Sequence, residues 1–239
     1  MFLINNLTVV IVTYKTNSQI LEECIESILG KAKILIVENS DDKDFKQKYE
    51  KKYANLEVVL SGSNLGYGAG NNKGVSLIKT RYVLISNPDV IYETDFFDNL
   101  KKYTDNNTDF TIIGPIYRSQ DYASHGFFED LKNKNIQDDI FTDSTLIKTH
   151  WIVGCTMIID LHKFNNKRLF DENYFLFFEE FDLCRRVLKN DGKIFVSKNL
   201  FVKHLGHKGS VAADPKYEKD SAFLRSWHWM WSSFYYYEK

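Results

Sequence analysis

Apolar residues in the first part of the chain alternate between short continuous runs and stretches with helical spacing. Residues 7–13 form a β-branched run, which is typical of a strand buried on both faces of a sheet. Residues 18–29 follow with apolar side chains three or four positions apart, which predicts a helix. Residues 34–37 and 56–60 are again strand-like, and the charged stretch 41–52 between them is typical of an exposed helix. This alternation predicts βαβ units and a parallel sheet.

A polar, glycine-rich stretch, residues 61–74, separates these units from the next apolar run. We expect a loop there, leading into a short helix around residues 75–78 and then into a strand that ends at Ser86. The first half of the chain therefore predicts about four parallel strands, with ligand-facing loops at their carboxyl ends.

The second half has a less regular pattern. Ordered elements are expected at a helix over 95–104, a strand over 110–114, an apolar segment over 151–159, a helix that follows the aromatic run 174–178, a strand over 193–197 and an amphipathic, aromatic helix over 220–239. Residues 117–145 are polar with few periodic apolar positions, which predicts a variable insertion or mobile loop.

Composition places the chain in the globular class. At 239 residues and 44% hydrophobic content, it is long enough for one sizeable core, and we expect one domain over 1–239. The net charge of -1 provides no global field for nucleic acid, so no nucleic-acid partner is expected. Three widely spaced cysteines, Cys24, Cys155 and Cys184, argue for a reducing compartment. No signal-peptide pattern and no run of ~20 apolar residues occurs, which favours a cytoplasmic protein.

The first candidate for chemistry is the turn Asn87-Pro88-Asp89, directly after the apolar run 82–86. Open α/β sheets bind ligands at the carboxyl ends of their strands, and a carboxylate there suits a hard divalent cation. The same three residues are also common turn formers, so a purely structural role stays open at this point.

The second candidate is the glycine-rich segment 64–74, which leads into a helix and could offer backbone N–H groups to an anionic ligand. Its spacing does not match the dinucleotide fingerprint, which would need a glycine at Asn71. It does not match a P-loop either, because Lys73-Gly74 reverses the required order. Ligand contact and a plain turn both remain open.

Two further clusters carry titratable groups. Glu179-Glu180-Phe181-Asp182 follows an aromatic run, so mutual repulsion and desolvation should raise at least one pKa toward the range of a general base. An acidic first helical turn that complements the helix dipole is the structural alternative. The glycine-flanked loop 204–210 carries His204 and His207, and a neutral histidine could complete a metal site begun by Asp89. Without cysteines, however, this loop has no zinc signature.

Together these residues resemble the inverting family 2 glycosyltransferases, especially the bacterial branch that includes many rhamnosyltransferases of surface polysaccharide assembly. The matches follow the family order along almost the whole chain. They lie at 10–14, 24–28, 36–40, 64–74, 87–89, Gly154 with Met157, 170–186, 204–210 and Arg225. The resemblance implies an α/β fold, a single nucleotide-diphospho-sugar transferase domain of GT-A type with a mostly parallel central sheet flanked by helices.

The resemblance also implies a donor site. Its donor-binding positions are Thr13, Glu38, Asn64, Gly66, Asn72, Asn87 and Asp89, and its metal-binding positions are Asp89 and His204, for Mg2+ or Mn2+. Glu38 stands where the family more often has Asp, which leaves the base of the nucleotide open. Asn87 replaces the first acid of the stricter D-x-D motif, as it commonly does in this branch.

The implied reaction is a single inverting displacement. Glu180 matches the catalytic base, which is Asp in most of the family, with Glu179 as a second candidate and Asp182 as a supporting acid. The base deprotonates an acceptor hydroxyl while that hydroxyl attacks the anomeric carbon, and a divalent cation neutralises the departing diphosphate. Trp151 and Gly154 are expected on the acceptor side.

Donor and acceptor are implied only as classes. The donor is a nucleotide sugar, dTDP-rhamnose or a UDP-sugar, and the acceptor is a saccharide or a lipid-linked saccharide. The aromatic helix 220–239 could pack on the domain or contact the inner face of the membrane peripherally, because Trp and Tyr favour bilayer interfaces. A catalytically silent nucleotide-sugar-binding scaffold and a sugar-phosphate nucleotidyltransferase remain as alternatives, although the latter characteristically has a basic glycine-rich loop after the first strand.

Overall fold

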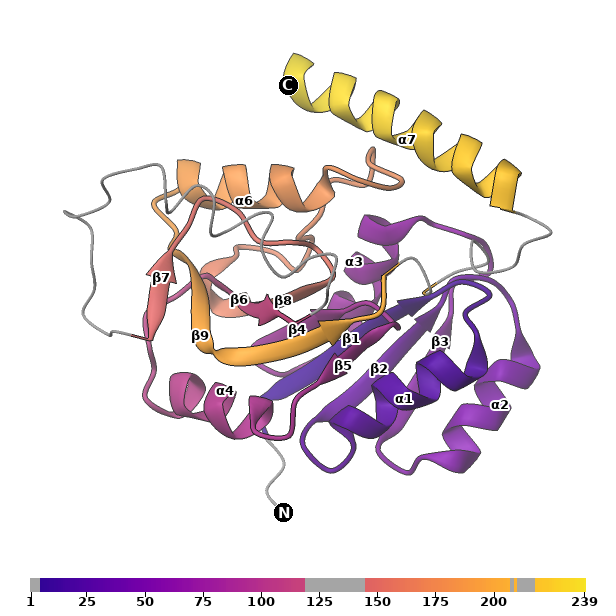
Figure 1. Ribbon diagram of the computed structural model, residues 1–239, viewed down its shortest axis with the longest axis horizontal. Coiled ribbons are helices and arrows are strands. Elements are labelled where there is room, and N and C mark those ends of the chain that lie inside the picture. Colours follow the sequence, from indigo (N-terminus) through magenta and orange to yellow (C-terminus); the bar gives the residue numbers. More distant parts are fainter. Residues whose placement is uncertain (1–4, 119–144, 207–208, 210–217) are drawn as a thin grey trace.

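The computed structural model describes residues 5–118, 145–206, 209 and 218–239 (Figure 1). Its strands are β1 (Leu7–Thr13), β2 (Lys33–Glu38), β3 (Leu56–Leu60), β4 (Tyr82–Ser86), β5 (Val90–Tyr92), β6 (Ile112–Tyr117), β7 (Leu146–Lys148), β8 (Thr156–Asp160) and β9 (Ile194–His204). Its helices are α1 (Ser18–Ile28), α2 (Lys43–Lys52), α3 (Tyr67–Leu77), α4 (Phe96–Asp105), the 3-10 turn η1 (Leu161–Lys163), α6 (Glu179–Lys189) and α7 (Glu218–Glu238).

The strands form one sheet in the order β3-β2-β1-β4-β8-β6-β9-β5, with β7 also paired to β9. Strands β1 to β4 are parallel, as the βαβ pattern predicts, and Thr13 lies opposite Glu38 at their carboxyl edge. Beyond β4 the sheet is mixed, because β8 runs antiparallel to both β4 and β6. The expected α/β fold is therefore confirmed, and its parallel character is concentrated in the first half.

Helices cover both faces of the sheet, which explains the continuous apolar runs in its strands. Along β1, Val9 and Ile11 enter a core shared with α1, α2 and α4. Val10 points the other way, into a core shared with α3 and α6. Strands of this kind must be buried on both sides, so the sheet is the middle of three layers (Figure 1).

The glycine-rich stretch differs from expectation, because most of it is helical and not a loop. Helix α3 begins at Tyr67, within the predicted loop 61–74. A Cβ atom on Gly70 would lie 3.0 Å from Cγ1 of Val12, and one on Gly74 would lie 2.6 Å from Cγ1 of Val10. Glycine therefore serves close packing of α3 against β1, a need that outweighs its low helix propensity.

The other predicted elements occur in the predicted order, but the short strands β5 and β7 were not expected. Strand β9 runs to His204 and is much longer than the expected 193–197. Of the predicted insertion 117–145, only its two ends are described: Tyr117 ends β6, Arg118 follows it, and Thr145 precedes β7. The remainder lies outside the described residues. The expected C-terminal helix is present as α7.

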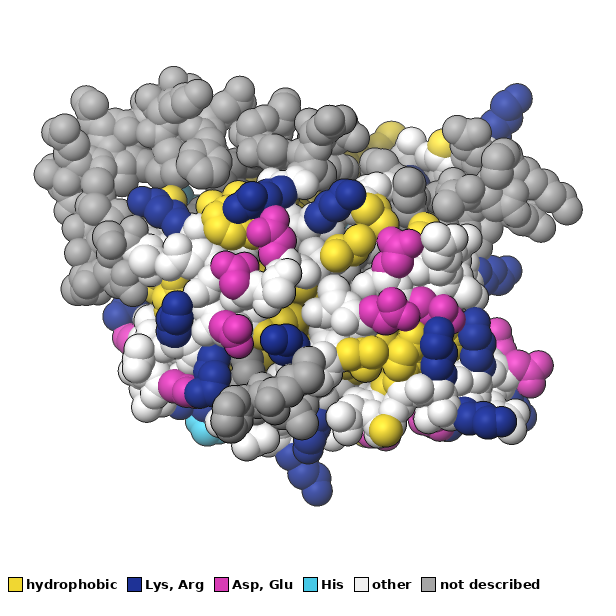
Figure 2. All heavy atoms as spheres, turned by 60° about the horizontal axis from the view of Figure 1, so that its bottom comes forward, with side chains coloured by type: hydrophobic (Ala, Val, Ile, Leu, Met, Phe, Trp, Pro, Cys, Tyr) yellow, Lys and Arg dark blue, Asp and Glu magenta, His cyan; other side chains and the backbone are white. Residues whose placement is uncertain are grey.

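Charged side chains are well mixed on the surface that Figure 2 presents. Acidic and basic groups are interspersed over this face, and its described residues form no broad area of one sign (Figure 2). This distribution agrees with the near-zero net charge.

Candidate active site

A cavity of about 370 Å³ opens at the carboxyl edge of the parallel strands. Several groups from distant parts of the chain meet there: the turn after β4, the start of α3, the start of α6, the end of β9 and one residue of α7. The lining residues are Val12, Tyr14, Asn39, Asn64, Gly66, Tyr67, Asn87, Pro88, Asp89, Val153, Gly154, Cys155, Phe175, Leu176, Phe177, Glu179, Glu180, His204, Gly209 and Arg225.

Asp89 and His204 form one side of this cavity. Strand β5 pairs with β9 so that Val90 lies opposite His204, which brings the imidazole to the turn that carries Asp89. The Nε2 atom of His204 lies 3.3 Å from Oδ1 of Asp89, and the carboxylate is almost fully buried. The backbone N–H of Leu205 also donates to the carbonyl oxygen of Asp89 at 2.9 Å. Two potential metal ligands from separate sequence motifs are thus adjacent.

The electrostatics of this pair favour a charged imidazole when no cation is present. Burial has the largest single effect and lowers the pKa of His204, but the interactions with Asp89 and Cys155 together outweigh it and raise the pKa to about 10. A cation that binds both side chains would take the place of that proton, because a ligating imidazole is neutral.

The two ligands suit a divalent cation. A carboxylate oxygen is the ligand that Mg2+ and Mn2+ prefer, and an imidazole nitrogen is a common additional ligand. The described residues contain no group of three or more His, Cys, Asp or Glu side chains able to hold a metal. A cation at Asp89 and His204 would therefore need further ligands from a bound diphosphate or from water, as Mg2+ sites commonly do.

Glu179 and Glu180, in the first turn of α6, line the same cavity. Burial raises the pKa of Glu180 to about 7. Burial and the neighbouring Glu180 raise the pKa of Glu179 well above its usual range. A carboxylate with a pKa near neutrality can both accept and release a proton under physiological conditions, so Glu180 is suited to general-base chemistry.

An unusual backbone precedes these carboxylates. Phe177 and Phe178 have φ angles of 69° and 67°, a left-handed conformation that bulky residues rarely adopt. Both rings pack edge-on against Trp229 of α7, with centroid distances of 5.5 and 5.0 Å. Two consecutive residues of this kind cost on the order of 1–3 kcal/mol each and persist where surrounding contacts hold them. The aromatic run therefore fixes the start of α6.

Asn39 also lines the cavity, although no role was predicted for it. Its Nδ2 donates to Oδ1 of Asn64 and to the carbonyl oxygen of Gly66, both at 3.0 Å, and its Oδ1 accepts from the N–H of Leu65 at 3.1 Å. It thereby holds the loop that carries two predicted donor-binding residues. The signal in the sequence was that Asn39 lies within residues 36–40, one of the stretches on which the family resemblance rests.

Gly66 and Tyr67 join this loop to the acidic side of the cavity. Gly66 has φ 83° and ψ -174°, and a Cβ atom there would lie 2.3 Å from the carbonyl oxygen of Phe175. The N–H of Tyr67 donates to that same carbonyl at 2.9 Å, and its hydroxyl donates to the carbonyl oxygen of Gly154 at 2.5 Å. Burial raises the pKa of Tyr67 well above its usual value, so the phenol remains a donor.

Three of the predicted donor-binding residues lie outside the cavity lining. Thr13 is buried at the end of β1, and its Oγ1 has no hydrogen-bond partner among the described residues. The carboxylate of Glu38 accepts from the N–H and the hydroxyl of Ser40, at 3.0 and 2.7 Å. The side chain of Asn72 pairs with both backbone groups of Phe170, at 2.8 and 2.9 Å. The contacts of Asn72 thus join α3 to the segment before α6.

The supporting acid, Asp182, also faces away from the cavity. It is fully buried and pairs with Arg186 at 2.7 Å. It also pairs with Lys239, which follows α7, at 2.9 Å, and Lys239 lies 2.7 Å from Asp171. Asp182 therefore holds α7 against the start of α6. Trp151, predicted on the acceptor side, lies on Phe181 with its ring centroid 5.0 Å away, next to a separate groove.

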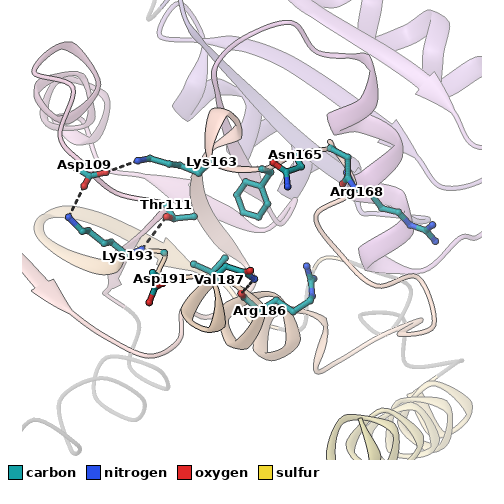
Figure 3. A pocket seen from close by; sticks show the side chains of 13 residues that line it. Asp109, Thr111, Lys163, Asn165, Arg168, Arg186, Val187, Asp191 and Lys193 are labelled. Atoms are coloured by element: carbon teal, nitrogen blue, oxygen red, sulfur yellow. Dashed lines mark hydrogen bonds and ion pairs between the residues drawn. The ribbon is translucent and has the colours of Figure 1, made fainter.

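A larger cavity, of about 560 Å³, lies at the other end of the sheet (Figure 3). Its basic residues are already engaged: Lys163 and Lys193 both bind Asp109, at 2.7 and 2.6 Å, and Arg186 binds Asp182. The described residues that line the larger cavity include no histidine, and the carboxylate of Asp109 among them is already paired with two lysines. The larger cavity therefore lacks the combination of carboxylates and imidazole found in the first cavity.

Comparison with known proteins identifies a family and supports the fold. The sequence model described as "Glycosyl transferase family 2" matches residues 8–166. The chain is 27% identical over 178 residues to the rhamnosyltransferase WbbL of Escherichia coli (strain K12), which covers 65% of this chain and 66% of that protein. It is 24% identical over 208 residues to the low-salt glycan biosynthesis hexosyltransferase Agl10 of Haloferax volcanii, covering 79% and 64%.

A third relative is the N-acetylglucosaminyl-diphospho-decaprenol L-rhamnosyltransferase of Mycobacterium tuberculosis (strain ATCC 25618 / H37Rv), 23% identical over 213 residues, covering 76% of this chain and 69% of that protein. The chain thus spans just under two thirds of WbbL and Agl10, and slightly more of the mycobacterial protein.

Solved structures share the fold at low sequence identity. GalNAc-T7 with UDP, GalNAc and Mn2+ superposes with a TM-score of 0.65 at 12% identity, covering 84% of this chain and 44% of that one. S. aureus TarS 1-349 in complex with UDP gives 0.59 at 15% identity, covering 89% and 62%.

Proposed function

The chain belongs to glycosyl transferase family 2, and from this premise we propose that it transfers a sugar from a nucleoside-diphosphate donor to a hydroxyl of a saccharide acceptor. The donor is dTDP-rhamnose or a UDP-sugar, the anomeric configuration inverts, and the product belongs to a surface polysaccharide. Family membership sets aside the nucleotidyltransferase alternative. A silent nucleotide-sugar-binding scaffold is the competing function.

The observation that carries this proposal is that two different chemistries line one cavity. Asp89 and His204 lie 3.3 Å apart there, where a diphosphate and a cation would be held. Glu179 and Glu180 line the same cavity, where a hydroxyl would be deprotonated. A displacement that inverts configuration needs a base for the attacking hydroxyl and charge neutralisation for the departing diphosphate, and this cavity contains residues for both.

Glu180 performs the proton transfer in the proposed reaction. One of its carboxylate oxygens takes the proton from the acceptor hydroxyl while the hydroxyl oxygen bonds to the anomeric carbon. The bond between that carbon and the diphosphate oxygen breaks, and its electron pair leaves with the nucleoside diphosphate. A divalent cation, when bound at Asp89 and His204, supplies charge neutralisation for the departing diphosphate. The hydroxyl of Tyr67 and the side chain of Asn39 hold the walls in place.

A lipid-linked acceptor is part of this proposal, and α7 supports it. Large apolar side chains of α7 recur at intervals of four and three residues and are 48–80% exposed. This apolar stripe consists of Phe223, Leu224, Trp227, Met230, Trp231, Phe234 and Tyr237. Tryptophan and tyrosine beside aliphatic groups are typical of helices that lie in a bilayer interface. One relative carries a decaprenol-linked substrate in its name.

The other side of α7 faces the catalytic domain. The hydroxyl of Ser232 donates to the carbonyl oxygen of Leu176 at 2.8 Å, and His228 stacks on Phe175 at 4.6 Å. Arg225 lines the catalytic cavity. In the described part of the chain, no helix is long and apolar enough to cross a bilayer. Contact through the stripe would therefore be peripheral, with the cavity close to the lipid surface.

Calorimetric binding of nucleoside diphosphates and nucleotide sugars, with Mn2+ and with chelator, tests the donor site. We expect a dTDP or UDP species to bind with Mn2+ and to lose affinity with chelator or in Asp89→Asn. No binding by any member of the panel would overturn the proposal. Donor binding without transfer to any saccharide would favour the scaffold.

A further inference from the structure

A second groove lies on the outer side of α6, separate from the catalytic cavity. It has a volume of about 430 Å³, and three aromatic rings line it: Trp151, Phe181 and Tyr236. Three basic side chains line it as well: His150, Arg185 and Lys189. We propose that this groove, the aromatic groove, binds a glycosyl phosphate, and that this group is the part of the acceptor beyond the reacting hydroxyl. The inference rests on the proposed function.

The aromatic rings provide the surface for a sugar. The rings of Trp151 and Phe181 lie 5.0 Å apart at 31°, and Tyr236 approaches Phe181 at 6.4 Å and 65°. Their π faces carry partial negative charge, which attracts the C–H groups on the apolar face of a pyranose ring. Trp151 and Phe181 are only partly buried, so a ligand can reach them.

The basic side chains provide the complement to a phosphate. No acidic residue lines the aromatic groove. Lys189 is exposed at the end of α6 and makes no ion pair with any described residue. Arg185 is held in place, because its Nη1 donates to the carbonyl oxygen of Tyr236 at 3.2 Å, its guanidinium lies 4.1 Å from the centre of that ring, and its Nη2 lies 3.5 Å from Oδ1 of the buried Asp182. Arg185 thus shares its charge with Asp182, whereas Lys189 has no ion pair among the described residues. A cation of this kind beside aromatic rings suits a group that is both sugar and anion.

The aromatic groove is continuous in sequence with the catalytic cavity on two sides. Phe181 follows Glu180 directly, and Trp151 comes two residues before Val153, which lines the cavity. Helix α6 and the segment 151–154 thus contribute lining residues to both spaces. In this proposal a saccharide that presents a hydroxyl to Glu180 extends along this shared lining toward Phe181 and Trp151. Tyr236 also precedes Tyr237 of the apolar stripe, so a lipid attached to the phosphate would leave toward that stripe.

The test measures binding of N-acetylglucosamine 1-phosphate to the full chain by calorimetry, with free N-acetylglucosamine and inorganic phosphate as comparison ligands. We expect the glycosyl phosphate to bind more tightly than either. Lys189→Gln should weaken that binding about tenfold, the effect of losing one charge-assisted hydrogen bond. Lys43→Gln, at an exposed lysine of α2, is the matched control and should change nothing.

A second variant, Trp151→Leu, removes one ring while leaving the contact between Arg185 and Tyr236 in place, and it should weaken binding of the glycosyl phosphate without affecting inorganic phosphate. Equal affinity in wild type and Lys189→Gln, or equal affinity for the sugar with and without its phosphate, would overturn the inference. The same sugar on a polyprenyl diphosphate in phosphatidylcholine vesicles forms a second arm. Binding in that arm that is tighter than binding to the same vesicles without the carrier identifies a lipid carrier as the source of the phosphate, and equal binding to the two kinds of vesicle identifies a soluble ligand.

Donor binding in the same samples separates this inference from the proposed function. If UDP or dTDP binds with Mn2+ and the glycosyl phosphate does not, the aromatic groove loses its role and the transferase proposal stands. If the glycosyl phosphate binds through Lys189 and no nucleotide binds, the aromatic groove is a glycosyl phosphate site and the transferase proposal is wrong.

Discussion

Gly154 lies directly against Glu180: a Cβ atom on the glycine would be 3.2 Å from the Cβ of the glutamate. The space that a side chain would fill at position 154 is therefore occupied by the carboxyl-bearing chain. This contact fixes where the Glu180 carboxylate can point.

Replacement of Glu180 by glutamine should abolish transfer and leave donor affinity unchanged. A general base contributes about 100-fold or more to the rate, and the amide cannot accept the proton. Turnover and calorimetric donor binding are measured on Glu180→Gln, with Glu57→Gln on the exposed side of β3 as control. Unchanged turnover would assign the base to Glu179 instead.

Activity and stability should depend on pH in opposite directions. The rate should rise as pH increases through about 7, because Glu180 must be ionised to act. The same raised pKa means that the folded state holds the proton more tightly than the unfolded state. The protonated Glu180 carboxyl therefore stabilises the folded state fully below the unfolded-state pKa of about 4.5, and this stabilisation is lost as pH rises through the folded-state pKa of about 7. Thermal unfolding from pH 5 to 9 should show a stability loss on the order of 2 kcal/mol that Glu180→Gln reduces. Identical pH profiles for both proteins would contradict this assignment.

Gly66→Ala should destabilise the protein far more than Gly62→Ala. Both glycines have φ near 84°, so alanine is strained at each, at about 1–2 kcal/mol. At Gly62 nothing lies within 4 Å of the new Cβ, whereas at Gly66 the carbonyl oxygen of Phe175 is 2.3 Å away. We expect Gly66→Ala to cost at least about 3 kcal/mol and to lower donor affinity. Equal denaturant midpoints for the two variants would show that the contact with Phe175 has no effect.

Vesicle binding should depend on the apolar stripe of α7. The double variant Trp227→Ala, Trp231→Ala should reduce binding to phosphatidylcholine vesicles at least tenfold, because both rings are about half exposed. Trp229 is a poorer choice, since it packs on Phe177 and Phe178. Leu77→Ala, at a comparably exposed residue of α3, is the control. If wild type does not sediment with vesicles, the membrane contact is wrong.

The regular half of the fold was predictable because β1, β2 and β4 contain continuous apolar runs, which indicate strands buried on both faces of a sheet. The glycine-rich stretch was not, since glycine normally disfavours a helix and only the contacts of Gly70 and Gly74 with β1 show why it forms one. The extension of β9 also depends on strand partners that the sequence does not reveal.

The candidate site, like the fold, was predictable from the sequence only in part. Asp89, His204 and Glu180 were accessible from motif order, and the structure brings them to one cavity. Asn39 and Tyr67 act through hydrogen bonds to distant backbone groups, which no local pattern shows. Asparagine is a residue type that often binds ligands, but the hydrogen bonds of the Asn72 side chain go to Phe170. The role of Asn72 in donor binding stays a prediction.

The pairing of β5 with β9 has a consequence for how the molecule assembles. Strands β1 to β4 come from one contiguous stretch with local connections, which close quickly. His204 reaches Asp89 only after a far longer loop has closed. We therefore expect nucleotide binding to recover later in refolding than far-ultraviolet circular dichroism, and simultaneous recovery would contradict this order. The expected kinetic trap is then a species in which β1 to β4 have paired but β5 and β9 have not, so that the donor site is incomplete.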